Sequence, residues 1–204
     1  MKNKNDVLEN CLMNIISAAK NLIDNENDRQ YLLESSGMER SIEFIFAYYI
    51  KLLLNSKNID VDCEYNKNFN NPKIIGIECD NCFSEKICEY KKVQKRLKKN
   101  KKIIPDILIH KRQSIDHDLI VIELKHHKRL YSIGHPTFEN DFKKLSYLTC
   151  SYSIYRYQLG LEVVFTRDNV YFLIFKDGKM LFDRFISIEE MEIIMKEGWK
   201  FGDC

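Results

Sequence analysis

The chain has 204 residues and a net charge of only +2, and 45% of its residues are hydrophobic, enough apolar material to fill the core of one folded domain. It contains no apolar run of about 18 residues and no signal-peptide pattern near its start, so we expect neither a membrane span nor export, but a cytoplasmic protein. The seven cysteines, an odd number, are then expected as reduced thiols or metal ligands, not as a disulfide framework.

Two helices are expected in the first quarter of the chain. Residues 6–23 repeat apolar side chains at spacings of three and four, which predicts an amphipathic helix with one buried face. Residues 37–55 are apolar on nearly every side, which predicts a second helix deep in the structure. Ser36 followed by Glu39 is a capping-box pattern for its start, so helix capping is one role open to Glu39.

The middle of the chain combines strand-like runs with an irregular segment. A short strand is expected at 59–68, and two apolar, β-branched strands are expected at 103–111 and 118–126. Between the short strand at 59–68 and the strand at 103–111, the segment from about 68 to 102 is interpreted as an insertion rich in Cys and Lys. Its last part, residues 91–102, holds eight basic residues and no acid, which leaves a charge of −6 on the rest of the chain.

This basic tract is typical of a surface that contacts phosphates. Lys and Arg side chains neutralise phosphates and release counterions, which gives affinity for nucleic acid of any sequence. A solvated loop that keeps the protein soluble is the alternative. The residues that we expect to contact nucleic acid are Lys95, Arg96, Lys98 and Lys99.

The last third of the chain is expected to be a helix, a β-rich stretch and a closing helix. The first helix spans about 138–150, and strand-like runs follow on both sides of Asp168-Asn169. Asp177-Gly178 predicts a two-residue hairpin turn, and Ser187 with Glu190 predicts the cap of the closing helix. The sequence has no internal repeat or Pro/Gly linker, so it predicts a single domain, residues 1–204, of mixed α/β (α+β) class.

Charged residues interrupt the two apolar strands of the middle region. If the strands form a hairpin whose loop is centred between Ser114 and Ile115, paired positions sum to 229 and Asp106 lies opposite Glu123. Lys125 then lies on the face of Glu123, because side chains alternate along a strand. Two opposed carboxylates repel each other unless a cation lies between them.

This pattern suits metal-assisted hydrolysis of a phosphodiester, with carboxylates that bind a hard cation and a lysine near the water and the phosphate. An exposed ladder of ion pairs on a half-solvated sheet is the alternative. Residues 119–122 are apolar on both faces, which predicts a central strand and favours the metal site. His110 shares the face of Asp106 and is expected to be hydrogen-bonded and exposed.

The motif of Pro105-Asp106, sixteen further residues and Glu123-Leu124-Lys125 resembles that of the PD-(D/E)XK nuclease superfamily. Segments similar to a bacterial branch of small stand-alone members follow each other in the family's order: MERSIEFIFAYYI, VDCEYNKN, IIPDILIHKR, LIVIELK and DFKKLSYLT. The resemblance implies a restriction-endonuclease-like αβββαβ core, with a mixed central sheet flanked by helices. An extra N-terminal helix and a C-terminal hairpin and helix would extend this core.

The resemblance also implies a function, namely hydrolysis of nucleic acid, with DNA as the expected substrate, by a Mg²⁺ or Mn²⁺ site. Asp106 and Glu123 would bind the metal, Lys125 would orient or activate water, and Glu39 on the first core helix would assist. Glu43, one turn further, is a reserve candidate, and Lys144 resembles a lysine of the family that could contact phosphate. A homodimer is a candidate assembly. Two alternatives stay open: an inactive nucleic-acid-binding module of the same fold, and a regulatory domain that binds a partner through a metal-bound cysteine loop.

Four cysteines lie close together in the sequence and could bind a second metal. Cys63, Cys79, Cys82 and Cys88 fall within 26 residues, and four thiols suffice for a Zn²⁺ site or an iron–sulfur cluster. The C-x2-C-x5-C run resembles that of iron–sulfur members of the superfamily, in which it follows the catalytic motif instead of preceding it. Unligated thiols are the alternative.

Overall fold

The computed structural model describes residues 4–34, 38–55, 58–64, 67–68, 71–72, 74–75, 101–112, 118–151, 153 and 155–198. Its helical elements are α1 (Lys4–Asp24), α2 (Glu26–Asp28), the π-helical turn η1 (Arg29–Leu33), α3 (Glu39–Leu54), the 3-10 turn η2 (Pro136–Phe138), α5 (Glu139–Thr149) and α6 (Ile188–Lys196). Its strands are β1 (Asp60–Cys63), β2 (Lys67–Asn68), β3 (Asn71–Pro72), β4 (Ile74–Ile75), β5 (Lys101–Lys102), β6 (Ile107–His110), β7 (Asp118–His126), β8 (Leu159–Phe165), β9 (Val170–Lys176), β10 (Lys179–Met180) and β11 (Ile186–Ser187).

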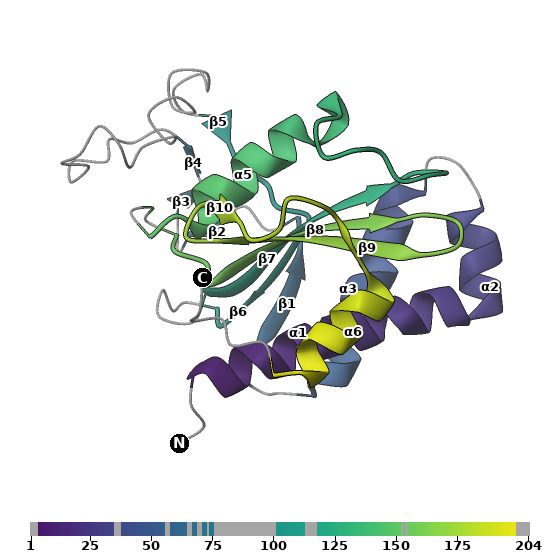
Figure 1. Ribbon diagram of the computed structural model, residues 1–204. Coiled ribbons are helices and arrows are strands. Elements are labelled where there is room, and N and C mark those ends of the chain that lie inside the picture. The colour runs from purple at the N-terminus through teal and green to yellow at the C-terminus, as the bar shows by residue number, and fades with distance from the viewer. Residues whose placement is uncertain are drawn as a thin grey trace.

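A seven-stranded mixed sheet forms the centre of the fold, so the predicted mixed α/β class is confirmed (Figure 1). The strand order is β1-β6-β7-β8-β9-β10, and β11 also pairs with β9. β7 and β8 run parallel to each other, whereas the other neighbours are antiparallel. β7 lies between β6 and β8 and is buried from Asp118 to Leu124, which confirms the predicted central strand.

The predicted register between β6 and β7 is also confirmed. Ile107 pairs with Ile122 and Ile109 pairs with Ile120, so paired positions sum to 229. The pairing shifts at His110, and the predicted loop centre lies outside the described residues. The predicted strand 103–111 is too long, because β6 begins only after Pro105, which has no N–H to donate to a ladder.

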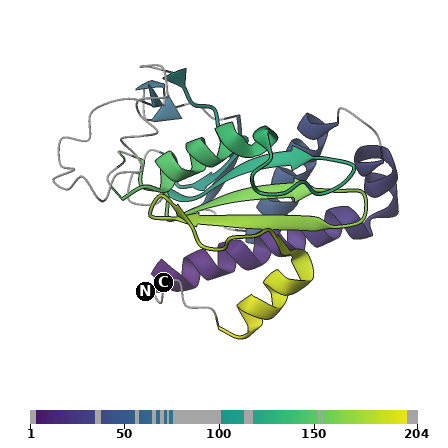
Figure 2. The same cartoon turned by 45° about the horizontal axis from the view of Figure 1, so that its top comes forward.

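Helices cover both faces of this sheet (Figures 1 and 2). α1, α3 and α6 pack against one face, in a core that includes Ile120, Ile122 and Leu124 of β7. α5 covers the other face, where Leu145 and Leu148 join a second core with residues that include Val121, Val164 and Leu173. Since side chains alternate along β7, Glu123 and Lys125 lie on the same face as Val121, beneath α5.

The first two predicted helices are present as α1 and α3, but the prediction of a deeply buried second helix is only partly correct. α3 buries one side, including Ile42 and Phe46. Phe44, Tyr48 and Leu52, spaced four residues apart, form an exposed apolar stripe on its other side. Ser36, the predicted capping residue, lies outside the described part of the chain.

The C-terminal half follows the predicted elements closely. α5 matches the expected helix, and the turn between β9 and β10 has positive φ angles at Asp177 and Gly178, 50° and 79°, as a hairpin of this type requires. The predicted capping box of α6 is confirmed, because the Ser187 hydroxyl accepts from the Glu190 N–H and the Glu190 carboxylate accepts from the Ser187 N–H.

Within the predicted insertion, β2 pairs with β3 and β4 pairs with β5, so it is not wholly irregular. Residues 76–100 lie outside the described part of the chain. No helix among the described residues is long and apolar enough to cross a membrane.

Close contact between α5 and the sheet depends on Gly160 of β8. A Cβ atom at this position would lie 3.0 Å from Thr149 Cγ2, 3.2 Å from Leu145 Cδ2 and 3.3 Å from Phe175 Cβ. These distances are shorter than ordinary carbon–carbon contacts, so even one added methyl group would push α5 away from β8.

Gly160→Ala should therefore lower the free energy of unfolding by about 1–2 kcal/mol. A loss of that size lowers the melting temperature of a domain of this length by about 2–8 °C, measurable by circular dichroism. The matched control is Gly134→Ala, because no atom lies within 4 Å of the added methyl group there. Equal melting temperatures for the two variants would contradict the close approach.

Candidate metal and catalytic site beneath helix α5

The four residues predicted for catalysis come from separate elements and meet at one end of the sheet. Asp106 directly precedes β6, Glu123 and Lys125 lie on β7, and Glu39 begins α3. The Lys125 ammonium lies 3.5 Å from Glu39 Oε1, and the Glu39 Oε2 atom accepts a 3.3 Å hydrogen bond from the His126 N–H. The predicted set is therefore brought together, although it spans more than 80 positions of the chain.

Asp106 is fixed by the backbone of the strand that carries Glu123. Its Oδ2 atom accepts a 2.7 Å hydrogen bond from the Leu124 N–H. Burial raises the pKa of Asp106, and the Leu124 N–H and the Lys125 ammonium only partly offset this effect. The Asp106 carboxylate is one of the charges that raise the pKa of Glu123, as expected for opposed carboxylates.

Glu123 has no solvent exposure, yet only one of its oxygen atoms has a partner among the described residues. The Lys144 ammonium of α5 donates a hydrogen bond to Glu123 Oε2, whereas Glu123 Oε1 has no hydrogen-bond partner. Burial and the neighbouring Asp106 raise the pKa of Glu123 well above its ordinary value, although Lys144 opposes them. Lys144 thus pairs with a predicted metal ligand, a contact that the sequence did not suggest.

Lys125 is held in its charged form. Burial alone would lower the pKa of its ammonium, but the carboxylates of Asp141 and Glu39 raise it above its ordinary value. The ammonium lies 3.0 Å from Asp141 Oδ2 and donates a 3.1 Å hydrogen bond to the Leu124 carbonyl. A lysine held in this way can supply positive charge and hydrogen bonds, but it is poorly suited to accept a proton at neutral pH.

Asp141 of α5 links the two lysines and was not identified from the sequence. It is buried, and its Oδ1 atom lies 2.9 Å from the Lys144 ammonium while Oδ2 faces Lys125. Burial would raise the pKa of Asp141, but the two ammonium groups lower it below its ordinary value. In the sequence it resembles an acid in the first turn of an exposed helix, so no local pattern marked it as buried.

Glu162 is the second residue that the sequence analysis missed. It lies on β8, directly beside Glu123 in the parallel register, and has no solvent exposure. Neither of its oxygen atoms has a hydrogen-bond partner among the described residues. Burial, then Asp141 and Glu123, raise the pKa of Glu162 well above its ordinary value. The signal that identified Glu123, a lone acid in an apolar strand, is also present in LGLEVVF and could have identified Glu162.

Glu43, the reserve candidate, is buried on α3 with its Oε1 atom unpaired among the described residues. Burial, together with Asp106 and Glu64, raises the pKa of Glu43 to about 7. Because the charge of Asp106 contributes to this raised pKa, a cation near Asp106 would favour the ionised form of Glu43.

The carboxylates fit a divalent cation chemically, because Mg²⁺ and Mn²⁺ prefer oxygen ligands and buried unpaired carboxylate oxygens require a partner. Within the described part of the chain, however, no three His, Cys, Asp or Glu side chains are already grouped as metal ligands. The two lysines explain this arrangement, since their ammonium groups lie between the carboxylates. A cation at Glu123 would have to displace or share the position of the Lys144 ammonium.

Other predicted site residues are only partly described. Cys79, Cys82 and Cys88, and the basic residues Lys95, Arg96, Lys98 and Lys99, lie outside the described residues, so their roles stay predictions. Cys63 lies on β1 as a half-buried free thiol. Burial and the nearby Glu43 raise the pKa of Cys63 to about 12, which disfavours the thiolate that metals bind.

The expectation of an exposed His110 is wrong. The ring is buried, with Nε2 2.8 Å from Asp62 Oδ2 and Nδ1 3.8 Å from Asp118 Oδ1. Arg112 also donates to Asp62. This cluster joins β1, β6 and β7 near the other end of β6, and every polar side chain in it has a partner, which is typical of a structural role.

Comparisons of this chain with protein-family models, with curated proteins and with solved structures find no match. Function is therefore inferred from the residues beneath α5 and from their geometry.

Glu43→Gln should make the protein more stable at about pH 8 in the presence of EDTA, by up to about 3 kcal/mol. The folded pKa of Glu43, about 7, lies above the ordinary value of 4.5, so its contribution to stability is present below pH 4.5 and is lost as the pH rises through 7. Gln stays neutral and avoids this loss. Urea unfolding at several pH values measures the difference, which should vanish near pH 4.5.

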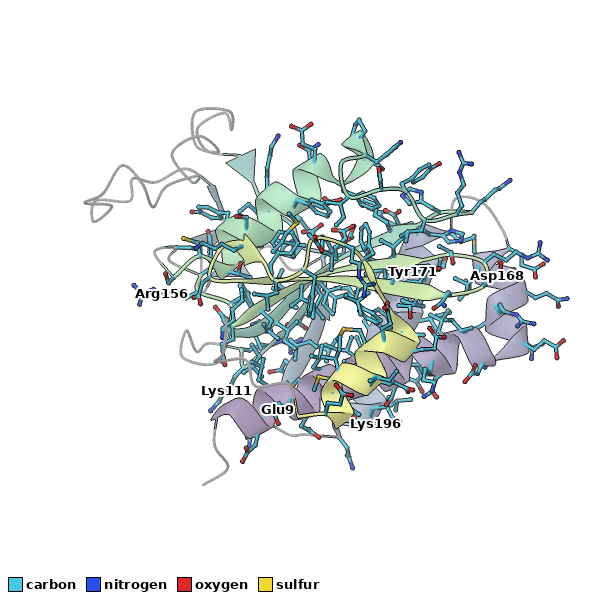
Figure 3. All side chains as sticks on the ribbon, in the orientation of Figure 1. Glu9, Lys111, Arg156, Asp168, Tyr171 and Lys196 are labelled. Carbon is cyan, nitrogen blue, oxygen red and sulfur yellow. The ribbon has the colours of Figure 1, made fainter. Side chains whose placement is uncertain are left out.

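The control is Glu9→Gln, which removes one negative charge from α1, away from the site (Figure 3). Relative to the wild type, Glu9→Gln should not become more stable as the pH rises from about 4.5 to about 8. The same pH dependence in both variants would show that net charge, not burial of Glu43, is responsible.

Proposed function

We propose that this protein is a metal-dependent nuclease that hydrolyses phosphodiester bonds of nucleic acid, most readily DNA, with Mg²⁺ or Mn²⁺. The observation that carries the proposal is the convergence of Asp106, Glu123 and Lys125, the residues of the PD-(D/E)XK motif, at one end of a central sheet. The order α3-β1-β6-β7-α5-β8, apart from the short strands β2 to β5, supports a restriction-endonuclease-like core.

In this mechanism Asp106 and Glu123 would hold the cation, and each side chain has a supporting contact. The Leu124 N–H orients Asp106, and the Lys144 ammonium orients Glu123. When bound there, a divalent cation supplies Lewis acidity to the phosphate and lowers the pKa of a bound water. A divalent cation bound by Asp106 and Glu123 would also remove the repulsion between these two carboxylates.

Lys125 would stabilise negative charge on the phosphate and orient the attacking water, rather than remove a proton from it, because its ammonium is held charged. Glu39 and Asp141 position this ammonium from opposite elements, α3 and α5. Lys144 is the second cation near the site and, once released from Glu123, could contact a phosphate oxygen.

A second candidate function is an inactive nucleic-acid-binding module of the same fold. The contact between Lys144 and Glu123 favours it, because an internal ammonium then satisfies the carboxylate that a metal would need. Such a module should bind DNA in a salt-dependent way without any requirement for a divalent cation.

The purified protein should degrade DNA in the presence of Mg²⁺ or Mn²⁺ but not in EDTA. Linear duplex, circular duplex and single-stranded DNA, with RNA alongside, define the substrate, and cleavage of the circle indicates an endonuclease. Glu123→Gln and Lys125→Met keep the shape of the buried side chains and should each lower the rate by at least about 100-fold. Unchanged circular dichroism spectra would show that both variants fold.

The matched control is Lys196→Ala, an exposed lysine on α6, on the opposite face of the sheet (Figure 3). It should retain the wild-type rate. Full activity of Lys125→Met would refute the assignment of the site. Salt-sensitive DNA binding without cleavage, unaffected by metal, would instead favour the binding module.

A further inference from the structure

Glu162 lies on an interior strand of the sheet and is the carboxylate with the least satisfied surroundings in the described structure. It is fully buried, and both of its oxygen atoms lack a hydrogen-bond partner among the described residues. An unpaired polar group in the interior costs about 1–3 kcal/mol, and an ionised one costs more. A Leu or Val at this position in LGLEVVF would avoid this cost, so the packing of β8 does not explain a glutamate.

The surroundings of Glu162 show what kind of partner is missing. Glu162 and Glu123 are direct neighbours on two parallel strands, which lie about 4.8 Å apart, and both side chains point toward α5. Glu123 Oε1 is also unpaired. Three buried acceptor oxygens thus lie on one face of two adjacent strands, and carboxylates accept hydrogen bonds or metals but donate nothing when ionised.

The charges beneath α5 favour a divalent partner. Asp106, Glu123, Asp141 and Glu162 are four carboxylates, and the lysines at 125 and 144 provide two ammonium groups. When all are ionised, and with Glu39 beside Lys125 as a fifth carboxylate, the carboxylates exceed the ammonium groups by three charges, so a divalent cation would remove most of this excess. A hydrogen bond from water would satisfy an oxygen atom but would leave this excess charge in place.

We propose that Glu162 is an additional ligand of the divalent cation, placed on β8 beside Glu123 and outside the Asp106, Glu123 and Lys125 motif. The inference rests on the proposed function, because it takes Glu123 as a ligand of the same ion. Asp141 and Glu123 lie on the two sides of the Lys144 ammonium, and the Lys144 side chain is 25% exposed. It can therefore turn toward solvent when a cation arrives, and this movement frees oxygen atoms of both carboxylates for the ion.

Binding of Mn²⁺ to the complete chain, without DNA, tests this inference by a readout that does not depend on cleavage. Electron paramagnetic resonance measures free Mn²⁺, and calorimetry with Mg²⁺ gives a second measurement. Glu162→Gln keeps the size of the side chain and removes its charge, and it should weaken Mn²⁺ binding at least about tenfold. The control, Glu192→Gln, removes a charge that pairs with Lys20 on the opposite face of the sheet, and it should change the affinity less than twofold.

Glu162→Asp, which retains a carboxylate on a shorter side chain, should bind Mn²⁺ more tightly than Glu162→Gln. The metal-free Glu162→Gln protein should melt no lower than the wild type, because it no longer buries an unpaired carboxylate, so weak binding would not reflect unfolding. Wild-type affinity in Glu162→Gln would overturn this inference and leave the proposed nuclease intact. An absence of Mn²⁺ binding by the wild type, even at millimolar concentration, would overturn both.

Discussion

The burial of Glu123 beneath α5 is the constraint on which the rest of the site depends. An ionised carboxylate in the interior costs several kcal/mol unless a cation compensates it, and the Lys144 ammonium provides this compensation. Asp141 then pairs with both Lys144 and Lys125, so the ion pairs extend from α5 to β7. The helix is consequently fixed to the sheet by charge as well as by its apolar residues, and loss of the Lys144 ammonium would leave the buried Glu123 without its partner.

The two buried polar clusters of β6 and β7 differ in how completely they are satisfied. Burial would raise the pKa of Asp62, but the hydrogen bonds that it makes with Arg112 and His110 lower it below its ordinary value. Beneath α5, by contrast, oxygen atoms of Glu123 and Glu162 remain without partners among the described residues. A satisfied cluster adds rigidity, whereas the unpaired acceptors beneath α5 are the feature on which the proposed metal ligand at Glu162 rests.

Local sequence patterns predicted the parts of the fold and of the site that depend on contacts between residues close together in the chain. Alternation along β7 and the short connection to β6 set the register that opposes Asp106 and Glu123, and the capping box and hairpin turn are local as well. The position of Glu162 depends instead on the parallel pairing of β7 with β8, whose strands are separated by more than 30 residues, and no local pattern sets that register. The exposed stripe of α3, including Phe44, was missed for a similar reason, because periodicity does not show which apolar face a neighbour covers.

The parallel pair has one more consequence, because α5 is the crossover helix that connects β7 to β8. Five of the charged groups, Glu123, Lys125, Asp141, Lys144 and Glu162, therefore belong to one contiguous βαβ unit, residues 118–165. A crossover of this kind closes when its helix docks on its two strands. The docking of α5 thus completes a layer of the core and assembles the charged groups in the same step, so this part of the site should form together with the fold and not be ordered afterwards.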